Sequence, residues 1–234
     1  VQFYQELHSL LAEEDKNQAT VAIAPSFTAI ASLCQLKSWI KTGAQNVHWD
    51  EQGAQTGEIS VGMLKEAGAE FVIIGHSERR QYYAETNLSA AKRLQTAVIN
   101  GLSAILCIGE TETEYKQGIT NNVIEQQLRA SLNGFDEKYI YQLLIAYEPV
   151  WAIGTGLTAT KQTIELVHTK IRKILSQIFS KQDNQVPILY GGSTKPDNAR
   201  EILACKEVSG VLVGGASLKP ESFRDIITNG IKGF

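Results

Sequence analysis

Residues 146–156 read A-Y-E-P-V-W-A-I-G-T-G and follow the short apolar run Leu143-Leu144-Ile145. A run of this length predicts a buried strand, so Glu148 stands where a strand ends and a loop begins. Pro149 favours an extended backbone at Glu148, and the glycines at the far end of the stretch can act as hinges. We therefore predict a lid with a carboxylate at its root, covering a site from which water is excluded.

The same unit, an apolar strand followed by a helix, recurs along the chain. We predict seven strands, at residues 20–24, 44–47, 71–74, 104–107, 143–146, 187–190 and 210–213. Helices are predicted at residues 1–14, 27–39, 60–67, 77–83, 88–100, 120–132, 160–179, 197–203 and 221–228. Strict alternation with near-continuous apolar strands is typical of a parallel sheet covered by helices.

Such a sheet is either open and doubly wound or closed into an eight-stranded barrel. Unusual residues follow nearly every predicted strand, among them His76, Glu148 and the pairs Gly191-Gly192 and Gly214-Gly215. In a barrel the loops after all strands converge on one face, whereas an open sheet gathers its ligand contacts at one switch point. We therefore favour a barrel, formed by residues 1–234 as a single domain.

The composition excludes several classes of function. The net charge is −3 and the basic residues are scattered, so we expect no nucleic-acid partner. No apolar run approaches the roughly 20 residues that a membrane span needs, and no leader pattern is present, so we expect a cytoplasmic protein. Cys34, Cys107 and Cys205 lack a C-x-x-C spacing, which argues against a disulfide framework and a structural zinc site. We expect Cys107, at a strand end, to be a packing residue.

Two glycine-rich segments follow the last two predicted strands. They are Gly191-Gly192-Ser193 and Gly214-Gly215-Ala216-Ser217. Glycine lets backbone N–H groups approach an anion closely, and barrels commonly hold phosphate in the loops after strands seven and eight. Either pair alone could equally form a tight turn, but their joint position favours a phosphate site.

His76 opens the segment H-S-E-R-R directly after a buried strand. The positive end of a helix dipole disfavours imidazolium, which would keep the ring neutral and able to donate a hydrogen bond. This would suit an electrophile, although a lone histidine is more often structural. Glu148 could be a catalytic carboxylate, or it could cap the lid or pair with an arginine. For Glu78, Arg79 and Arg80 we predict ion-paired support, with a solvated surface position as the alternative for Arg80.

Four segments together resemble the triosephosphate isomerase family, in its order and with its spacing. They are G-H-S-E-R-R at 75–80, A-Y-E-P-V-W-A-I-G-T-G at 146–156, Y-G-G-S at 190–193 and L-V-G-G-A-S-L at 212–218. Further matches are G-A-Q-N-V at 43–47, G-A-Q-T-G-E-I-S at 53–60 and C-I-G-E at 107–110. The resemblance spans essentially the whole chain. It implies a (β/α)8 barrel that interconverts dihydroxyacetone phosphate and D-glyceraldehyde 3-phosphate through an enediolate, in glycolysis and gluconeogenesis, without metal or organic cofactor.

The resemblance also implies roles for particular residues. Glu148 would be the base that moves a proton between adjacent carbons, and His76 would be the neutral electrophile, as this family is known to use them. Glu78 and Cys107 would support this pair. The contacts to the substrate phosphate would come from Gly154, Ser193, Gly214 and Gly215.

The long connection from Trp49 to Glu58 resembles the family's dimer loop. In that loop Thr56 would reach towards the active site of the partner subunit, supported by Gln45 and Asn46. The resemblance therefore implies a homodimer.

One family feature is missing from the given sequence. The family begins with a strand that carries N-W-K-x-N, and nothing similar precedes Val1. The strands on either side of its place would carry unpaired edges, and the lysine facing the substrate phosphate would be absent. We therefore expect further residues upstream in a longer natural protein.

Two other functions stay open at this point. One is a catalytically silent barrel that acts as a binding or assembly protein, because the lysine is absent. The other is a different phosphosugar enzyme such as an aldolase, which would need a Schiff-base lysine at a strand end; none is evident in the sequence.

Overall fold

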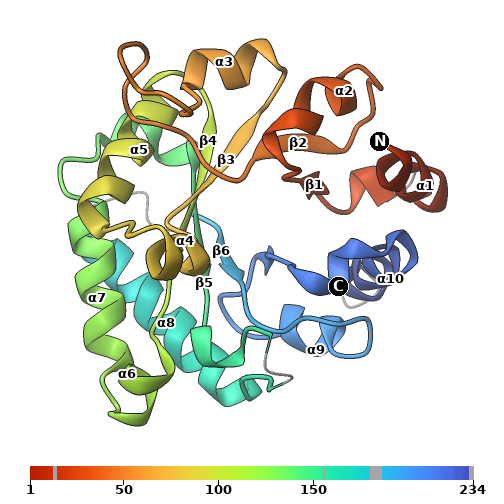
Figure 1. Cartoon of the computed structure of the whole chain (residues 1–234). Coiled ribbons are helices and arrows are strands. Elements are labelled where there is room, and N and C mark those ends of the chain that lie inside the picture. The colour runs from red at the N-terminus through yellow and green to blue at the C-terminus, as the bar shows by residue number, and fades with distance from the viewer. Residues whose placement is uncertain (13–14, 155–156, 180–185, 232–234) are drawn as a thin grey trace.

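The computed structural model describes residues 1–12, 15–154, 157–179 and 186–231 (Figure 1). Within these residues seven parallel strands form one sheet in the order β1-β2-β3-β4-β5-β6-β7. The strands are β1 (Ala22–Ile23), β2 (Lys41–Ala44), β3 (Phe71–Ile74), β4 (Ser103–Ile108), β5 (Leu143–Tyr147), β6 (Ile188–Tyr190) and β7 (Gly210–Val211). The prediction of seven parallel strands is confirmed for this part of the chain.

Helices surround the outside of the curved sheet (Figure 1). The α-helices are α1 (Gln2–Leu10), α2 (Ile30–Cys34), α3 (Val61–Glu66), α4 (Ser77–Tyr82), α5 (Asn87–Ile99), α6 (Glu112–Lys116), α7 (Thr120–Ser131), α8 (Lys161–Ile178), α9 (Ala199–Leu203) and α10 (Pro220–Ile231). Short 3-10 helices are η1 (Asp15–Asn17), η2 (Phe27–Ala29), η3 (Glu137–Gln142), η4 (Val150–Ala152) and η6 (Gly215–Leu218).

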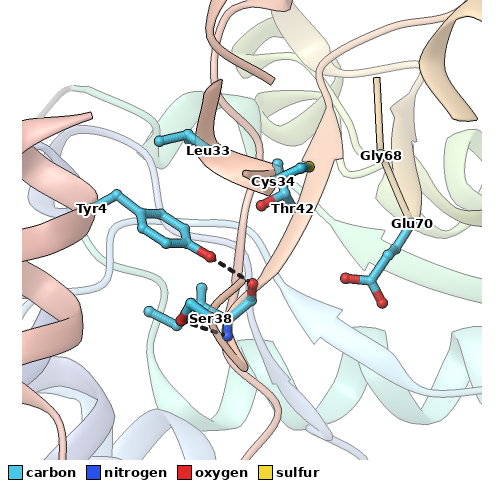
Figure 2. Close-up of a pocket in the computed structure, with 8 residues that line it drawn as sticks. Tyr4, Leu33, Cys34, Ser38, Thr42, Gly68 and Glu70 are labelled. Carbon is cyan, nitrogen blue, oxygen red and sulfur yellow. Dashed lines mark hydrogen bonds between the residues drawn. The ribbon is translucent and has the colours of Figure 1, made fainter. Parts of the chain in front are cut away.

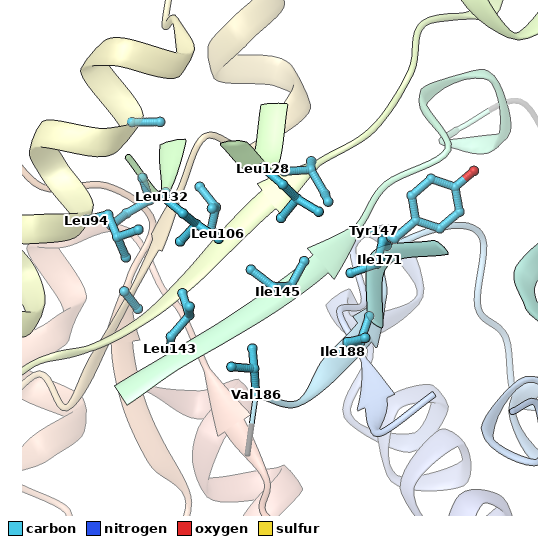
Figure 3. Close-up of a cluster of buried hydrophobic side chains, with 14 of the residues drawn as sticks. Leu94, Leu106, Leu128, Leu132, Leu143, Ile145, Tyr147, Ile171, Val186 and Ile188 are labelled. Atoms are coloured by element: carbon cyan, nitrogen blue, oxygen red, sulfur yellow. The ribbon is translucent and has the colours of Figure 1, made fainter. Parts of the chain in front are cut away.

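Strand β3 is apolar throughout because side chains on both faces of the sheet are buried there. Val72 and Ile74 belong to the cluster between the sheet and the helices, whereas Phe71 and Ile73 belong to a separate cluster on the inner face. Alternate residues of a strand point to opposite faces, so a strand that is covered on both sides shows no polar alternation. Figure 3 shows the outer cluster, with Leu94 and Leu128 from helices packed against strand residues such as Ile145.

The sheet has two free ends within the described residues. β1 and β7 are the terminal strands of the sheet order and do not pair with each other. Outside them α1 packs against α10, and Figure 1 shows both helices beside the opening. The outer layer of helices is thus continuous where the inner layer of strands is open, as expected for a barrel in which the edges of β1 and β7 are unpaired.

Two predicted elements differ clearly from the observed ones. The strand predicted at 44–47 was wrong in position, because Gln45 turns away to donate to the Ala24 carbonyl oxygen (2.9 Å) and the Val47 carbonyl oxygen accepts a side-chain hydrogen bond. The helix predicted at 27–39 is a 3-10 turn followed by α2, and Lys37 adopts a left-handed conformation (φ 51°) soon after α2 ends.

The helix α6 was not predicted, although the sequence carries its start signal. The hydroxyl of Thr111 accepts from the Glu114 N–H, and the Glu114 carboxylate accepts from the Thr111 N–H. This reciprocal cap satisfies two backbone donors at the start of the helix. The T-x-x-E pattern at 111–114 was therefore the missed indication.

Candidate active site

Two of the predicted site residues meet at the carboxyl ends of the strands. Glu148 directly follows β5 and His76 follows β3, with β4 between those strands. His76 Nε2 lies 2.9 Å from Glu148 Oε1. The Glu148 side chain is 2% exposed and that of His76 is 28% exposed, so the pair lies at a partly open surface with its carboxylate covered.

Ser77 is a third member of the site that the sequence reasoning did not single out. Its backbone N–H donates to Glu148 Oε2 (3.0 Å), and its hydroxyl lies 3.5 Å from Glu148 Oε1. Ser77 is the first residue of α4, where backbone N–H groups have no partner within the helix and therefore bind an anion readily. The only sequence signal was its place beside His76.

The hydrogen bonds of His76 define its tautomer. The Glu78 backbone N–H donates to His76 Nδ1 (3.3 Å), so Nδ1 carries no proton and Nε2 is the donor towards Glu148. Burial lowers the pKa of His76, but the hydrogen bond and the charge of Glu148 outweigh burial, so the pKa is raised overall. The accepting Nδ1 is consistent with the predicted neutral ring that donates through Nε2, while the contact with Glu148 shifts this pKa in the direction opposite to that expected from the helix dipole.

Cys107 lies on the inner face of β4 and is fully buried, as predicted for a packing residue. Burial, the charge of Glu148 and a hydrogen bond to Glu148 together raise the pKa of this thiol well above its ordinary value. It therefore stays protonated and donates to the carboxylate. The Glu78 side chain, unlike that of Cys107, is largely exposed, and its carboxylate lies 3.8 Å from His76 Nδ1.

Arg80 supports the site, but through neutral acceptors and not through the predicted ion pair, and it is not part of a solvated surface as the alternative had it. Its guanidinium donates to the carbonyl oxygens of Gly75 (2.7 Å) and Cys107 (3.1 Å) and to Asn87 Oδ1 (2.7 Å). It thus joins the ends of β3 and β4 to the start of α5.

Two glycines provide the space that Glu148 occupies. A Cβ atom at Gly109 would lie 1.7 Å from the Glu148 carbonyl oxygen, and a Cβ atom at Gly191 would lie 2.8 Å from Glu148 Cγ. Any side chain at either position would displace the carboxylate or its backbone. Gly191 was expected to serve a phosphate, and this contact shows a second reason for glycine there.

The glycines predicted to bind phosphate have open surroundings. A Cβ atom at Gly154, Gly214 or Gly215 would meet no atom within 4 Å, so an anion could approach the backbone at each of them. Ser193 is partly buried in the segment that follows β6. Thr155 and Gly156, which belong to the predicted lid, lie outside the described residues.

The first part of the predicted lid is anchored on the loop after β4. Trp151 of η4 donates through Nε1 to Glu110 Oε1 (2.8 Å), and the Val150 N–H donates to the Glu110 carbonyl oxygen (3.1 Å). Tyr115 stacks on the Trp151 ring with the centroids 4.3 Å apart. Burial raises the pKa of Glu110, and the hydrogen bonds from Trp151 and Tyr147 act in the opposite direction.

The loop from Trp49 to Glu58 projects between β2 and α3, and residues 50–58 are all exposed, Thr56 among them. Its base is closed by a hydrogen bond from the His48 N–H to the Ile59 carbonyl oxygen (2.8 Å). Gln45 and Asn46 lie just before this base, and Asn46 is buried. The site residues and the loop are thus on separate segments that both begin near the carboxyl ends of the strands.

A cavity of about 150 Å³ lies elsewhere and is not the candidate site (Figure 2). Ile40 and Glu70, which line it, precede β2 and β3, so the cavity is at the amino ends of the strands, opposite Glu148. In the part of the chain that the structure describes, no three His, Cys, Asp or Glu side chains form a group that could hold a metal ion. Across the same residues no helix has the length and apolar character needed to cross a membrane.

Comparisons with known proteins agree on one family. The family model for triosephosphate isomerase matches residues 1–230. Triosephosphate isomerase of Dictyoglomus turgidum is 47% identical over 210 residues, covering 88% of this chain and 84% of the relative. Triosephosphate isomerase of Lawsonia intracellularis is 49% identical over 215 residues, covering 91% of this chain and 85% of the relative. The crystal structure of triosephosphate isomerase from Bartonella henselae superposes with a TM-score of 0.87 at 37% identity, covering 97% of this chain and 92% of that one.

Proposed function

Because this chain belongs to the triosephosphate isomerase family and is therefore an isomerase, we propose that it interconverts dihydroxyacetone phosphate and D-glyceraldehyde 3-phosphate through an enediolate. The expected TIM-barrel fold is confirmed by the solved structure that superposes on it. A binding or assembly protein is not favoured, since the named relatives match over most of their length.

The contact between His76 Nε2 and Glu148 Oε1, 2.9 Å long, carries the proposal for catalysis. In our proposal a substrate oxygen replaces Glu148 as the acceptor of the hydrogen bond from His76 Nε2–H. The released carboxylate then abstracts a proton from one carbon and returns it to the next. A positioned carboxylate that is largely removed from water is a competent general base for this step.

The remaining polar groups fit a phosphorylated triose. Backbone N–H groups at Gly154, Gly214 and Gly215, together with Ser193, would hold the phosphate at the mouth of the barrel. The lid that begins at η4 would then cover the site. Covering matters because an enediolate exposed to water would eliminate phosphate before it is reprotonated.

We further propose a cytoplasmic homodimer in which the loop from Trp49 to Glu58 contacts the partner subunit. Exposure of all residues from 50 to 58 and the resemblance to the family's dimer loop support this proposal. Fractionation of source cells would test the location, with recovery in a membrane or secreted fraction as the contradicting result.

The catalytic proposal is tested by Glu148→Gln in a coupled isomerase assay. We expect kcat to fall at least about 100-fold, the lower end of what a positioned base contributes. The matched control is Glu112→Gln on α6, which removes an exposed carboxylate paired with Lys116 and should leave kcat unchanged. Turnover of Glu148→Gln within a few-fold of the parent protein would refute the assignment. Absence of isomerase activity from a protein that also carries the expected upstream strand would instead support the binding or assembly function.

A further inference from the structure

A buried carboxylate joins α4 to α5. The Glu85 side chain lies between these helices and is 1% exposed. Its Oε2 accepts from Arg79 Nε of α4 at 2.9 Å, and its Oε1 lies 2.9 Å from Arg93 Nε of α5. A buried carboxylate requires compensating positive charge, and here two guanidinium groups share that role.

Arg93 also reaches the base of the 49–58 loop. Its Nη1 donates to Asn46 Oδ1 (3.3 Å) and to the Val47 carbonyl oxygen. Its guanidinium lies over the Trp49 ring, with Cζ 4.9 Å from the ring centroid. One side chain therefore contacts the Glu85 carboxylate and also Asn46, Val47 and Trp49 in the chain that enters the loop.

Arg79 connects the same carboxylate to the helix that begins at His76. The Arg79 backbone N–H donates to the His76 carbonyl oxygen (2.8 Å), and the Glu85 N–H donates to the Arg79 carbonyl oxygen (3.1 Å). Arg79 lies three residues after His76, within the first turn of α4. Movement of Glu85 would therefore be transmitted to the turn that places the imidazole.

These contacts form a continuous path from the loop through Arg93, Glu85 and Arg79 to His76. Arginine suits the position of Arg93 because its planar guanidinium has five donors in a fixed arrangement, whereas lysine offers a single point charge. We propose that Arg93 is a positioning residue that couples the 49–58 loop to α4 and thereby to His76. The kinetic part of this inference rests on the proposed role of His76.

Hydrogen–deuterium exchange of Arg93→Met, with the full chain, tests the coupling without any reference to activity. We expect amides of the 49–58 loop and of α4 to exchange faster together, each by about tenfold, since this variant removes the hydrogen bonds to Asn46 and Val47 and the ion pair with Glu85. Lys92→Met is the matched control, because Lys92 Nζ also lies over the Trp49 ring (5.3 Å from its centroid) but the residue is exposed. Faster exchange in the loop alone, or the same change in Lys92→Met, would overturn the coupling.

Kinetics of the same variants give a second and separate readout. We expect Arg93→Met to lower kcat about tenfold with KM changed less than about twofold, because misplacing a donor slows the chemical step more than it weakens phosphate binding. Arg93→Lys should recover part of kcat, since it keeps a cation beside Glu85. An Arg79→Met and Arg93→Met cycle should be non-additive, because both side chains act through Glu85. Additive effects of the two substitutions, or a rise in KM alone, would contradict the proposal. If the parent protein has no isomerase activity but Arg93→Met still speeds exchange in both the loop and α4, only the role of His76 is refuted.

Discussion

Lowering the pH from about 7 to about 5 should destabilise this protein through one histidine of α8, His168. The side chain is fully buried, and its Nδ1 lies 3.0 Å from the Glu207 carbonyl oxygen, so Nδ1 carries the proton and donates. The other ring nitrogen, Nε2, is buried without a hydrogen-bond partner in the described part of the chain. Protonation would therefore place an unpaired charged donor in the core.

The size of the effect follows from the pKa of His168, which burial lowers from the ordinary 6.5 to about 4, while the Glu207 carbonyl oxygen opposes the change. Between these two values the unfolded chain binds a proton that the folded chain does not, so stability is lost as the pH falls. One pH unit corresponds to about 1.4 kcal/mol, which gives about 2 kcal/mol of lost unfolding free energy at pH 5 relative to pH 7. The loss approaches about 3 kcal/mol near pH 4.

Urea denaturation of the parent protein and of His168→Gln at both pH values measures this contribution. Glutamine keeps a donor for Glu207 but does not titrate, so the variant should lose about 2 kcal/mol less than the parent on acidification. The raised pKa of His76 acts with the opposite sign, because its stabilisation is present at low pH and is lost as the pH rises through that pKa. Comparing two proteins that both contain His76 cancels that contribution.

His8→Gln is the matched control, since it removes a histidine from a partly exposed position on α1. It should leave the pH dependence of the parent protein unchanged. If His168→Gln and the parent lose the same unfolding free energy between the two pH values, the reasoning about the unpaired Nε2 is wrong.

Two further predictions concern the site and the assembly. Gly191→Ala should lower kcat by about 10-fold or more, because the new Cβ would lie 2.8 Å from Glu148 Cγ. The control Gly62→Ala on α3 should leave kcat unchanged, since its Cβ would approach only Ser60 Oγ at 3.8 Å. Equal kcat values for the two variants would contradict the crowding argument. Sedimentation velocity should show a dimer at micromolar concentrations, and Thr56→Arg should shift it towards monomer by burying an unpaired charge. A monomeric parent protein, or a variant that associates as tightly as the parent, would argue against the loop as the contact.

The local patterns of the sequence predicted most of the elements near the site. The strand at 71–74 was located to the residue, because its residues are all apolar and a glycine follows. The strand predicted at 44–47 was misplaced. The observed strand β2 begins with Lys41 and Thr42, and these polar residues do not show the apolar pattern by which strands were predicted. Only hydrogen bonds to β1 and β3, which are distant in sequence, identify its position.

The residues that complete the site carried weaker signals for the same reason. Ser77 and Glu148 are 71 residues apart, and Arg93 and Asn46 are 47 apart, so no local periodicity links them. Gly109 could be recognised as a glycine but not as the place where the Glu148 backbone passes. Such contacts exist only once parallel strands bring the ends of several segments to one face.

The sequence by itself determined the alternation of strands and helices, the family, and the candidacy of His76 and Glu148, because apolar periodicity and short motifs are local properties of the chain. The tertiary structure alone decided that Glu148 accepts hydrogen bonds from His76 and Ser77, that its charge raises the pKa of His76, and that Arg93 joins the loop to α4. These are distances and charges between segments far apart in the chain, and only folding brings those segments together.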